Sequence, residues 1–214
     1  MSAPENIAWL LNIRGYDNPN SPIPNARLII SKNKNFFLIT KKSHAIKIIN
    51  EKKINKNNVI DIKELPNLIN KLKGNKFIID DKTCSIFYEN IIKSKFRILN
   101  KDDPIYRLKS IKNLYEINHM IKAHEKDGLA LTKFIYWIKK INKKIITEVN
   151  AQNKLEKFRK INKSYLFPSF NTIAGSGSNG AIVHYRATTK TTKKINKKDI
   201  SVSYTHLRAH ETRH

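Results

Sequence analysis

The sequence contains few residues of several kinds that usually identify a class of protein. Cys84 is the only cysteine among 214 residues, which excludes an internal disulfide and favours a reducing compartment. The uncharged stretch at 165–185 is interrupted by serine, asparagine, glycine and proline, so it does not predict a membrane span. The first residues show no basic segment followed by an apolar core, as a signal peptide requires. These absences predict a cytoplasmic protein that does not enter a membrane.

Acidic residues are also scarce, with 17 against 42 lysines and arginines and a formal net charge of +25. Nucleic-acid-binding proteins gather basic residues on one face and often use arginine for bidentate contacts. Here only eight of the basic residues are arginine, and the lysines are spread along the chain between asparagine and isoleucine. This pattern is typical of AT-biased codons, and no specific nucleic-acid binding is expected. A basic nucleic-acid-binding protein stays an alternative, because counterion release needs no designed site.

Short apolar runs and helical stretches alternate through the first hundred residues, which predicts an α/β arrangement. The expected strands are 7–13, 26–30, 36–40, 59–62 and 77–80, and the expected helices are 43–50, 65–73 and 84–93. Asp102, Asp103 and Pro104 interrupt the pattern. We therefore expect one domain at 1–103 and a second at 104–200.

The second domain is predicted to begin with a long helix. Asn113 and Glu116 have the spacing of a capping box. A 3-4 spacing then predicts an inward-facing stripe made of Leu114, Ile117, Ile121, His124, Gly128, Leu131, Ile135 and Ile138. In that stripe His124 is expected to be a core histidine, and Gly128 to allow close packing. A second helix is expected over 147–160, with Ala151, Leu155 and Phe158 facing inward.

The most informative segment is the glycine-rich stretch at 169–187. A loop with Gly175 and Gly177 is predicted to lead into a strand at 181–187, which would place Ile182, His184 and Arg186 on one face. His184 is the candidate catalytic residue, because an imidazole titrates near neutral pH. The residue pattern alone favours a half-buried strand histidine bonded to backbone. Arg186 is a candidate for pairing with a substrate carboxylate or for a surface role, and Tyr185 is expected to pack on the opposite face.

A phosphate cradle is excluded at this loop, because a strand rather than a helix N-terminus is predicted to follow the glycines. The segment from Ser169 to Ala187 instead resembles the segment ahead of the first metal ligand in aminopeptidase P, of the creatinase-like "pita-bread" metallopeptidases. Residues 7–17, 113–137 and 147–159 resemble further parts of that family in the same order. The resemblance implies a creatinase N-terminal-like α/β domain at 1–103 and an incomplete N-terminal portion of a pita-bread catalytic domain at 104–200.

The resemblance also implies an activity, the removal of an N-terminal residue from peptides with proline at position two. Two divalent metal ions, expected to be Mn²⁺, would be held by two Asp, one His and two Glu beyond Ile200, so no metal ligand is assigned in this chain. His184 would contact the substrate or tetrahedral intermediate, or shuttle a proton. Proline-containing peptides and a homodimer are the implied partners. The chain as given is expected to be inactive, and a non-catalytic pita-bread binding or adaptor module is the alternative function.

Residues 201–214 resemble nothing in that family and read like a translated cloning adapter. We expect them to be an artefactual, disordered tail. His210 to His214 matches the H-E-x-x-H zinc-protease pattern. A catalytic zinc site needs a third protein ligand and a packed helix, which a chain end is not expected to provide. We interpret the match as chance.

Overall fold

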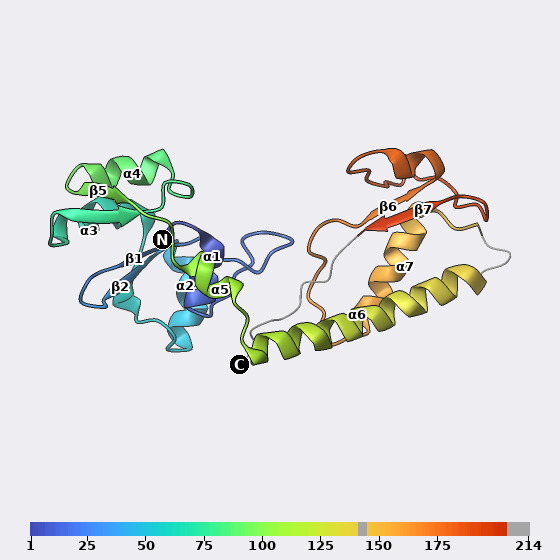
Figure 1. Ribbon diagram of the computed structural model, residues 1–214, viewed down its shortest axis with the longest axis horizontal. Coiled ribbons are helices and arrows are strands. Elements are labelled where there is room, and N and C mark those ends of the chain that lie inside the picture. The colour runs from blue at the N-terminus through green and yellow to red at the C-terminus, as the bar shows by residue number, and fades with distance from the viewer. Residues whose placement is uncertain (141–144, 205–214) are drawn as a thin grey trace. The chain divides into compact units, whose positions relative to one another are not determined.

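The protein divides into two compact units, Met1–Ile111 and Lys112–His214. The structure is a computed structural model that describes residues 1–140 and 145–204, and the ribbon of these residues is shown in Figure 1. The division falls after helix α5 (Ile105–Ser110), one short helix beyond the boundary expected from the sequence at residue 103.

The first unit begins with helix α1 (Pro4–Leu10) and a three-stranded sheet. Strand β1 (Arg27–Ile30) pairs antiparallel with β2 (Phe36–Ile39), and β2 pairs parallel with the short β3 (Val59–Ile60). Helix α2 (Lys42–Asn50) connects β2 to β3. The strand expected at 7–13 is therefore wrong. A short apolar run has no clear period, and Pro4 at the first turn favours a helix because its φ is already helical.

A second, two-stranded sheet completes the unit. Helix α3 (Leu65–Lys71) precedes β4 (Lys76–Ile79), which pairs parallel with β5 (Arg97–Asn100) across helix α4 (Ile86–Lys93). One-turn 3₁₀ helices lie at Lys56–Asn58 and Ile62–Glu64. The other predicted strands and helices of this unit are confirmed to within a few residues, while β5 and α5 were not predicted.

Two apolar clusters form the core of the first unit. One joins α1 to the first sheet through buried residues such as Ile7, Leu28 and Leu38. The other joins the second sheet to α3 and α4 around Ile69, which is fully buried. The carboxylate of Asp103 is also buried and accepts hydrogen bonds from the Asn6 side chain and the Ile105 backbone, each at 2.9 Å.

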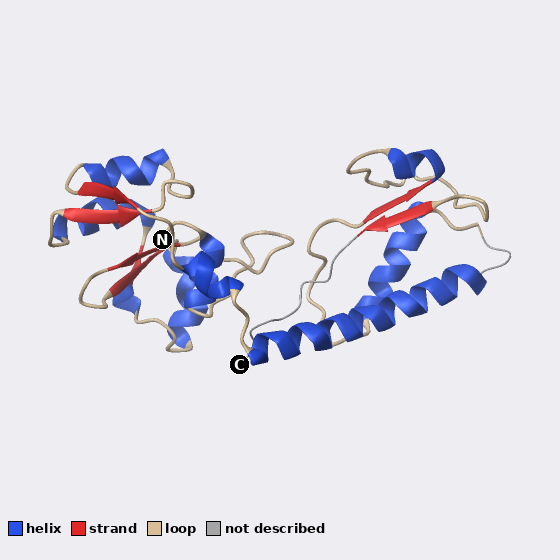
Figure 2. Cartoon of the chain, viewed as in Figure 1, coloured by secondary structure: helices blue, strands red, loops and turns tan. Residues whose placement is uncertain are grey.

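The described part of the second unit contains two α-helices, a 3₁₀ helix and a two-stranded sheet, coloured by type in Figure 2. Helix α6 (Leu114–Lys140) starts at the predicted cap, where Asn113 and Glu116 bond each other's backbone N–H at 2.9 and 3.0 Å. Helix α7 (Glu148–Lys160) starts at a capping box between Thr147 and Asn150. Strand β6 (Ile173–Ser176) pairs antiparallel with β7 (Ser201–Tyr204), and the 3₁₀ helix η3 (Gly177–Ala181) lies between them in sequence.

Helix α6 packs on α7 through a face that the sequence pattern did not single out. Phe134 contacts the buried cluster of Ile146, Ala151 and Leu155, and Arg159 forms a bidentate ion pair with Asp127 at 2.6 and 3.0 Å. The buried face of α6 contains residues 127, 130 and 134. Residues 128, 131 and 135 of the predicted stripe each follow one position later, which is a rotation of about 100° around the helix.

Most of the predicted stripe on α6 is consequently exposed, and only Ile138 joins the core. Leu114 is 79% exposed and Ile121 is 52% exposed. His124 is exposed rather than in the core, with Nδ1 bonded to the carbonyl of Met120. Nothing lies within 4 Å of a Cβ built on Gly128, so close packing does not explain this glycine.

The expected disordered tail is wrong for its first four residues, which form β7 with Ser201 paired to Ser176. Residues 201–204 alternate serine with larger side chains, which fits the period of a strand. The rest of the expected tail, including the H-E-x-x-H match, lies outside the described residues. Among the helices that the structure describes, none is long and apolar enough to cross a membrane.

Candidate functional site

The glycine-rich loop folds back on strand β6 instead of continuing as a second strand. Residues 177–181 form η3, and residues 182–184 form a turn, so the strand predicted at 181–187 is wrong. Gly177 has φ +57°, which reverses the chain directly after β6. A Cβ on Gly175 would lie 2.9 Å from the carbonyl oxygen of Asn179, so only glycine permits this close return. The glycines were recognised in the sequence, but the extent of the loop was not.

His184 lies at the end of this turn with φ +56°. Such a backbone conformation is uncommon for a residue with a Cβ, and it persists where the surroundings impose it. His184 is exposed and lines a cavity of about 250 Å³, together with Ile173, Gly175, Asn179, Gly180, Ile182 and Val202. The lining combines small and apolar groups with one imidazole. This arrangement can hold a small apolar group beside a proton donor or acceptor.

Arg186 is exposed and is not one of the residues that line this cavity. The predicted alignment of Ile182, His184 and Arg186 on one strand face does not form, because the segment is not extended. The cavity still brings Ile182 and His184 together. Arg186 remains a candidate only for contact with groups outside the described residues.

The centre of the site is the carboxylate of Glu148, in the first turn of α7. Its side chain is fully buried and accepts hydrogen bonds from the backbone N–H groups of Ser176 at 2.7 Å and Lys193 at 2.9 Å. Burial raises the pKa of Glu148, but these hydrogen bonds and those from Tyr185 and Asn179 outweigh it and lower the pKa below its usual 4.5. Glu148 is therefore an ionised, satisfied group at the base of the loop.

Tyr185 belongs to the same cluster, and the expectation that it packs on the opposite face of a strand from His184 is wrong. Its hydroxyl lies 2.8 Å from Oε2 of Glu148 and accepts a hydrogen bond from the Asn179 amide at 2.7 Å. Burial and the bond to Glu148 raise the pKa of Tyr185. Sequence reasoning missed the role of Glu148, because an acidic residue after a threonine cap is already explained by the helix dipole.

Asp199 supports the other side of the loop. It accepts hydrogen bonds from the Ser176 hydroxyl at 3.2 Å and from the Asn196 backbone at 3.0 Å. These bonds lower the pKa of Asp199, the Asn196 backbone bond being the strongest cause. Within residues 1–140 and 145–204, no three His, Cys, Asp or Glu side chains form a group that could hold a metal ion. The carboxylates near His184 are occupied by protein donors, so these residues do not fit a metal site.

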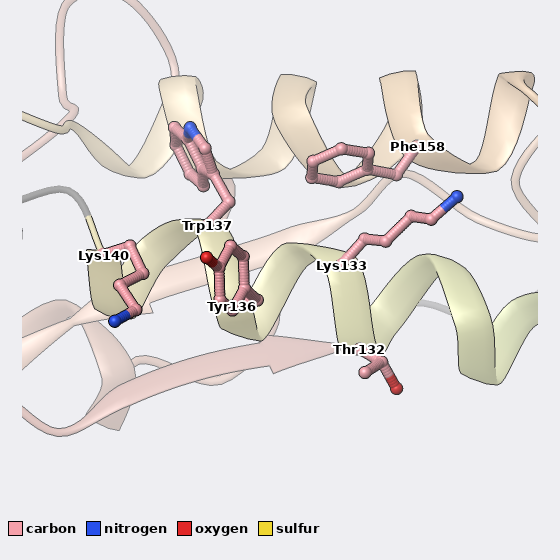
Figure 3. A pocket seen from close by; sticks show the side chains of 6 residues that line it. All are labelled: Thr132, Lys133, Tyr136, Trp137, Lys140 and Phe158. Carbon is pink, nitrogen blue, oxygen red and sulfur yellow. The ribbon is translucent and has the colours of Figure 1, made fainter.

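A second cavity, of about 530 Å³, lies at the surface of α6 and α7 (Figure 3). Trp137 and Phe158 project between the two helices, while Thr132 points away from α7. The ammonium group of Lys154 lies 5.5 Å from the Trp137 ring and 4.9 Å from the Phe158 ring. No histidine or carboxylate is among the described residues that line this cavity, and these residues offer apolar contact rather than acid–base chemistry.

Comparison with known proteins assigns both units. The family described as Creatinase/Prolidase N-terminal domain matches residues 1–116, and the family described as Metallopeptidase family M24 matches residues 118–211. The chain belongs to the creatinase/prolidase metallopeptidases. The resemblance inferred from the loop is thereby confirmed, as is the fold class of a creatinase-like α/β unit followed by the start of a metallopeptidase unit.

Two curated relatives of this chain are Xaa-Pro aminopeptidases. Xaa-Pro aminopeptidase ApepP of Drosophila melanogaster is 32% identical over 208 residues, covering 94% of this chain and 33% of the relative. Xaa-Pro aminopeptidase 1 of Dictyostelium discoideum is 30% identical over 205 residues, covering 91% of this chain and 32% of the relative. The chain therefore spans about a third of the length of the curated relatives it matches.

A solved structure shows the same fold. The X-prolyl aminopeptidase of Caenorhabditis elegans, described as a cytosolic enzyme with a di-nuclear active site, superimposes with a TM-score of 0.81 at 22% identity. The alignment covers 96% of this chain and 35% of that enzyme. An X-Pro aminopeptidase of Thermotoga maritima superimposes with a TM-score of 0.64 at 18% identity and covers 98% of this chain and 57% of that protein. The fold of the metallopeptidase family is thus present through the described part of the second unit.

Proposed function

We propose that this sequence belongs to an Xaa-Pro aminopeptidase, which releases the N-terminal residue from peptides with proline at position two. The observation that carries the proposal is the unbroken similarity to such enzymes over 94% of the chain, through both family matches. Such a protein would act in the cytoplasm, since the C. elegans neighbour is described as cytosolic. A homodimer is proposed from the family resemblance alone.

Metal chemistry in this proposal belongs to residues outside the described part. Two divalent ions, proposed to be Mn²⁺, would supply Lewis acidity and a hydroxide nucleophile in the longer protein. No step through them is assigned to the residues described, and the chain as given is expected to have no peptidase activity.

The role proposed for His184 uses only its own geometry. It lines a cavity wide enough for a small apolar side chain, and its imidazole is exposed to an incoming ligand. A histidine so placed can donate a hydrogen bond to a carbonyl oxygen that gains charge, or carry a proton to the leaving amine. Arg186 is proposed to pair with a carboxylate, either of the substrate or of the remainder of the catalytic domain.

The test uses the product of the whole gene, supplied with Mn²⁺ and a peptide with proline at position two. His184→Ala is expected to lower kcat about 10²- to 10⁴-fold, the usual contribution of a general acid or base. His124→Ala removes an exposed histidine on α6 and serves as the matched control. A whole gene product without cleavage, or a 214-residue chain that cleaves the peptide by itself, would contradict the proposal.

A non-catalytic binding module is the second candidate. The exposed apolar face of α6, with Leu114 and Ile121 among its members, favours a protein that uses this fold for contact. The gene beyond codon 200 separates the two functions. Two Asp, one His and two Glu at the family's ligand positions support the enzyme, and their replacement supports the module.

Nucleic-acid binding remains the third candidate because of the net charge of +25. We propose that the protein has no specific nucleic-acid partner. A gel shift that survives about 0.2 M salt would contradict this, since binding by unspecific charge weakens steeply over that range.

A further inference from the structure

Among the acidic side chains that the structure describes, Glu148 accepts hydrogen bonds from the largest number of protein groups. Its exposed fraction is 0%, and four donor groups from three separate segments converge on its two oxygens. A buried carboxylate is costly unless such donors replace its water. Here the donors do not come from its own helix, but from the residues around His184.

The two oxygens share the Asn179 amide and otherwise hold different parts of the loop. Oε1 accepts from the Ser176 backbone at 2.7 Å and from the Asn179 amide at 3.1 Å. Oε2 accepts from the Tyr185 hydroxyl at 2.8 Å, from the Lys193 backbone at 2.9 Å and from the same Asn179 amide at 3.2 Å. The carboxylate therefore joins the end of β6, the 3₁₀ helix η3 and the segment after the turn.

His184 lies between the groups that Glu148 holds. Asn179 precedes it by five residues and Tyr185 follows it directly, and these two side chains also bond each other at 2.7 Å. The turn between them places His184 at φ +56°. An unfavourable backbone angle of this kind is stable only where neighbouring contacts determine it. The turn is closed by backbone bonds from Ile182 to Asn179 and from Tyr185 to Ile182, and the side chains of Asn179 and Tyr185 at its two ends contact one carboxylate.

We propose that Glu148 is a positioning residue, which sets the turn at 182–185 and thereby holds the His184 imidazole in the cavity. It does not touch the substrate, and it acts through Asn179 and Tyr185. Its effect on catalysis rests on the function proposed above, whereas its effect on the conformation of His184 does not.

Glu148→Gln tests the proposal with the least change in shape. A glutamine has one acceptor oxygen and one NH₂ donor. In either orientation its NH₂ group faces a backbone N–H, that of Ser176 or that of Lys193, and one of these bonds is lost. Glu156→Gln is the matched control on the same helix, where the carboxylate pairs with Lys160 at the surface.

The first readout is NMR of the 214-residue chain. In Glu148→Gln we expect the ¹³Cα and ¹³Cβ shifts of His184 to lose their positive-φ values, and amide exchange of Ser176 or Lys193 to rise about 10- to 100-fold. The signals of α6 and α7 are expected to stay helical. Unchanged His184 shifts in a folded variant would overturn the proposal, as would equal changes in Glu156→Gln.

Tyr185→Phe provides the second variant if Glu148→Gln does not fold. It keeps the backbone bonds to Glu148 and removes the hydroxyl that contacts Glu148, Asn179 and the Thr191 carbonyl. In this variant the ¹³C shifts of His184 are expected to move, while the backbone amides of Ser176 and Lys193 stay protected from exchange. Unchanged His184 shifts would overturn the proposal.

The second readout is the kinetics of the whole gene product. Both variants are expected to lower kcat more than they raise KM, because a displaced imidazole weakens the transition state rather than general binding. If the His184 shifts move but kcat is unchanged, Glu148 has the conformational role proposed here but no effect on catalysis. A wild type without activity would contradict the proposed function alone, since the NMR result stands independently.

Discussion

The two units of this chain use their buried groups in different ways. Met1–Ile111 has two apolar clusters that connect its sheets to α1, α3 and α4. The described part of Lys112–His214 has one apolar cluster, between α6 and α7, and its glycine-rich loop is organised around the buried carboxylate of Glu148. An apolar cluster tolerates the exchange of one apolar side chain for another of similar size. A buried charge is destabilised when any one of its partners is removed. The first unit also buries the carboxylate of Asp103, but the candidate site lies in the second unit, where the carboxylate of Glu148 organises the loop itself.

The largest expected effect tests the apolar side of this comparison. Ile69→Ala removes a fully buried side chain of the first unit and should lower its free energy of unfolding by about 2–5 kcal/mol. Urea unfolding in backgrounds that keep only Trp9 or only Trp137 (Trp137→Phe or Trp9→Phe) reports each unit by fluorescence, because each unit contains one tryptophan. Ile78→Ala, at a side chain that is 55% exposed, is the control and should cost less than about 1 kcal/mol. A loss of the same size at Ile78 would mean that the clusters do not dominate this unit.

The next effect tests the polar side. Glu148→Gln should destabilise the second unit by about 1–3 kcal/mol, because at least one buried backbone N–H is left without an acceptor. Trp137 fluorescence during urea unfolding measures this loss of stability. Trp9 fluorescence should show an unchanged free energy of unfolding for the first unit. Glu156→Gln should lie within about 0.5 kcal/mol of wild type. Equal stabilities for the two variants would remove the contrast between the units.

Acid should affect the same bond network. The folded state holds the pKa of Glu148 below its unfolded value of 4.5, so the stabilisation from its ionised form is complete above that pH and is lost as pH falls through the folded pKa. Wild type should therefore lose its advantage over Glu148→Gln as the pH falls below about 4.5. Unfolding of the two proteins, followed by Trp137 between about pH 6 and pH 3, measures the difference. A constant difference across this range would contradict the account.

The smallest effect is expected at a position that the sequence pattern placed in the core. Ile121→Ala on α6 should change the free energy of unfolding by no more than about 0.5 kcal/mol, because the side chain is 52% exposed and alanine favours the helix. Leu155→Ala on α7, where the side chain is 2% exposed, is the contrasting variant and should cost about 2–5 kcal/mol. Similar losses at both positions would show that the exposed face of α6 is covered in solution.

Local patterns predicted the elements well where a single physical cause determines them. The cap at Asn113 and Glu116 and the helix over 147–160 depend on neighbouring residues, and both are confirmed. The strand expected at 7–13 is wrong because Pro4 lies outside the apolar run that suggested it. The inward stripe predicted for α6 is wrong in most of its members. A 3-4 spacing does not show which face of a helix packs against another element.

The candidate site was only partly predictable for the same reason. The glycines and His184 are visible in the sequence, and they carry the family resemblance. The convergence of Ser176, Tyr185 and Lys193 on Glu148 is not visible, because these residues are 28 to 45 positions away from it. Hydrogen bonds over such separations have no periodicity that a sequence pattern could reveal.

The sequence by itself determined most of the alternation of helices and strands, the caps, the presence of a loop at the glycines and the family. Periodicity, capping and glycine geometry act within a few residues, so these features can be predicted from the sequence. Only the tertiary structure decided which face of α6 is buried, that β7 pairs with β6, and that one carboxylate fixes the turn at His184. Each of these depends on a partner far away in the chain, whose position folding alone establishes.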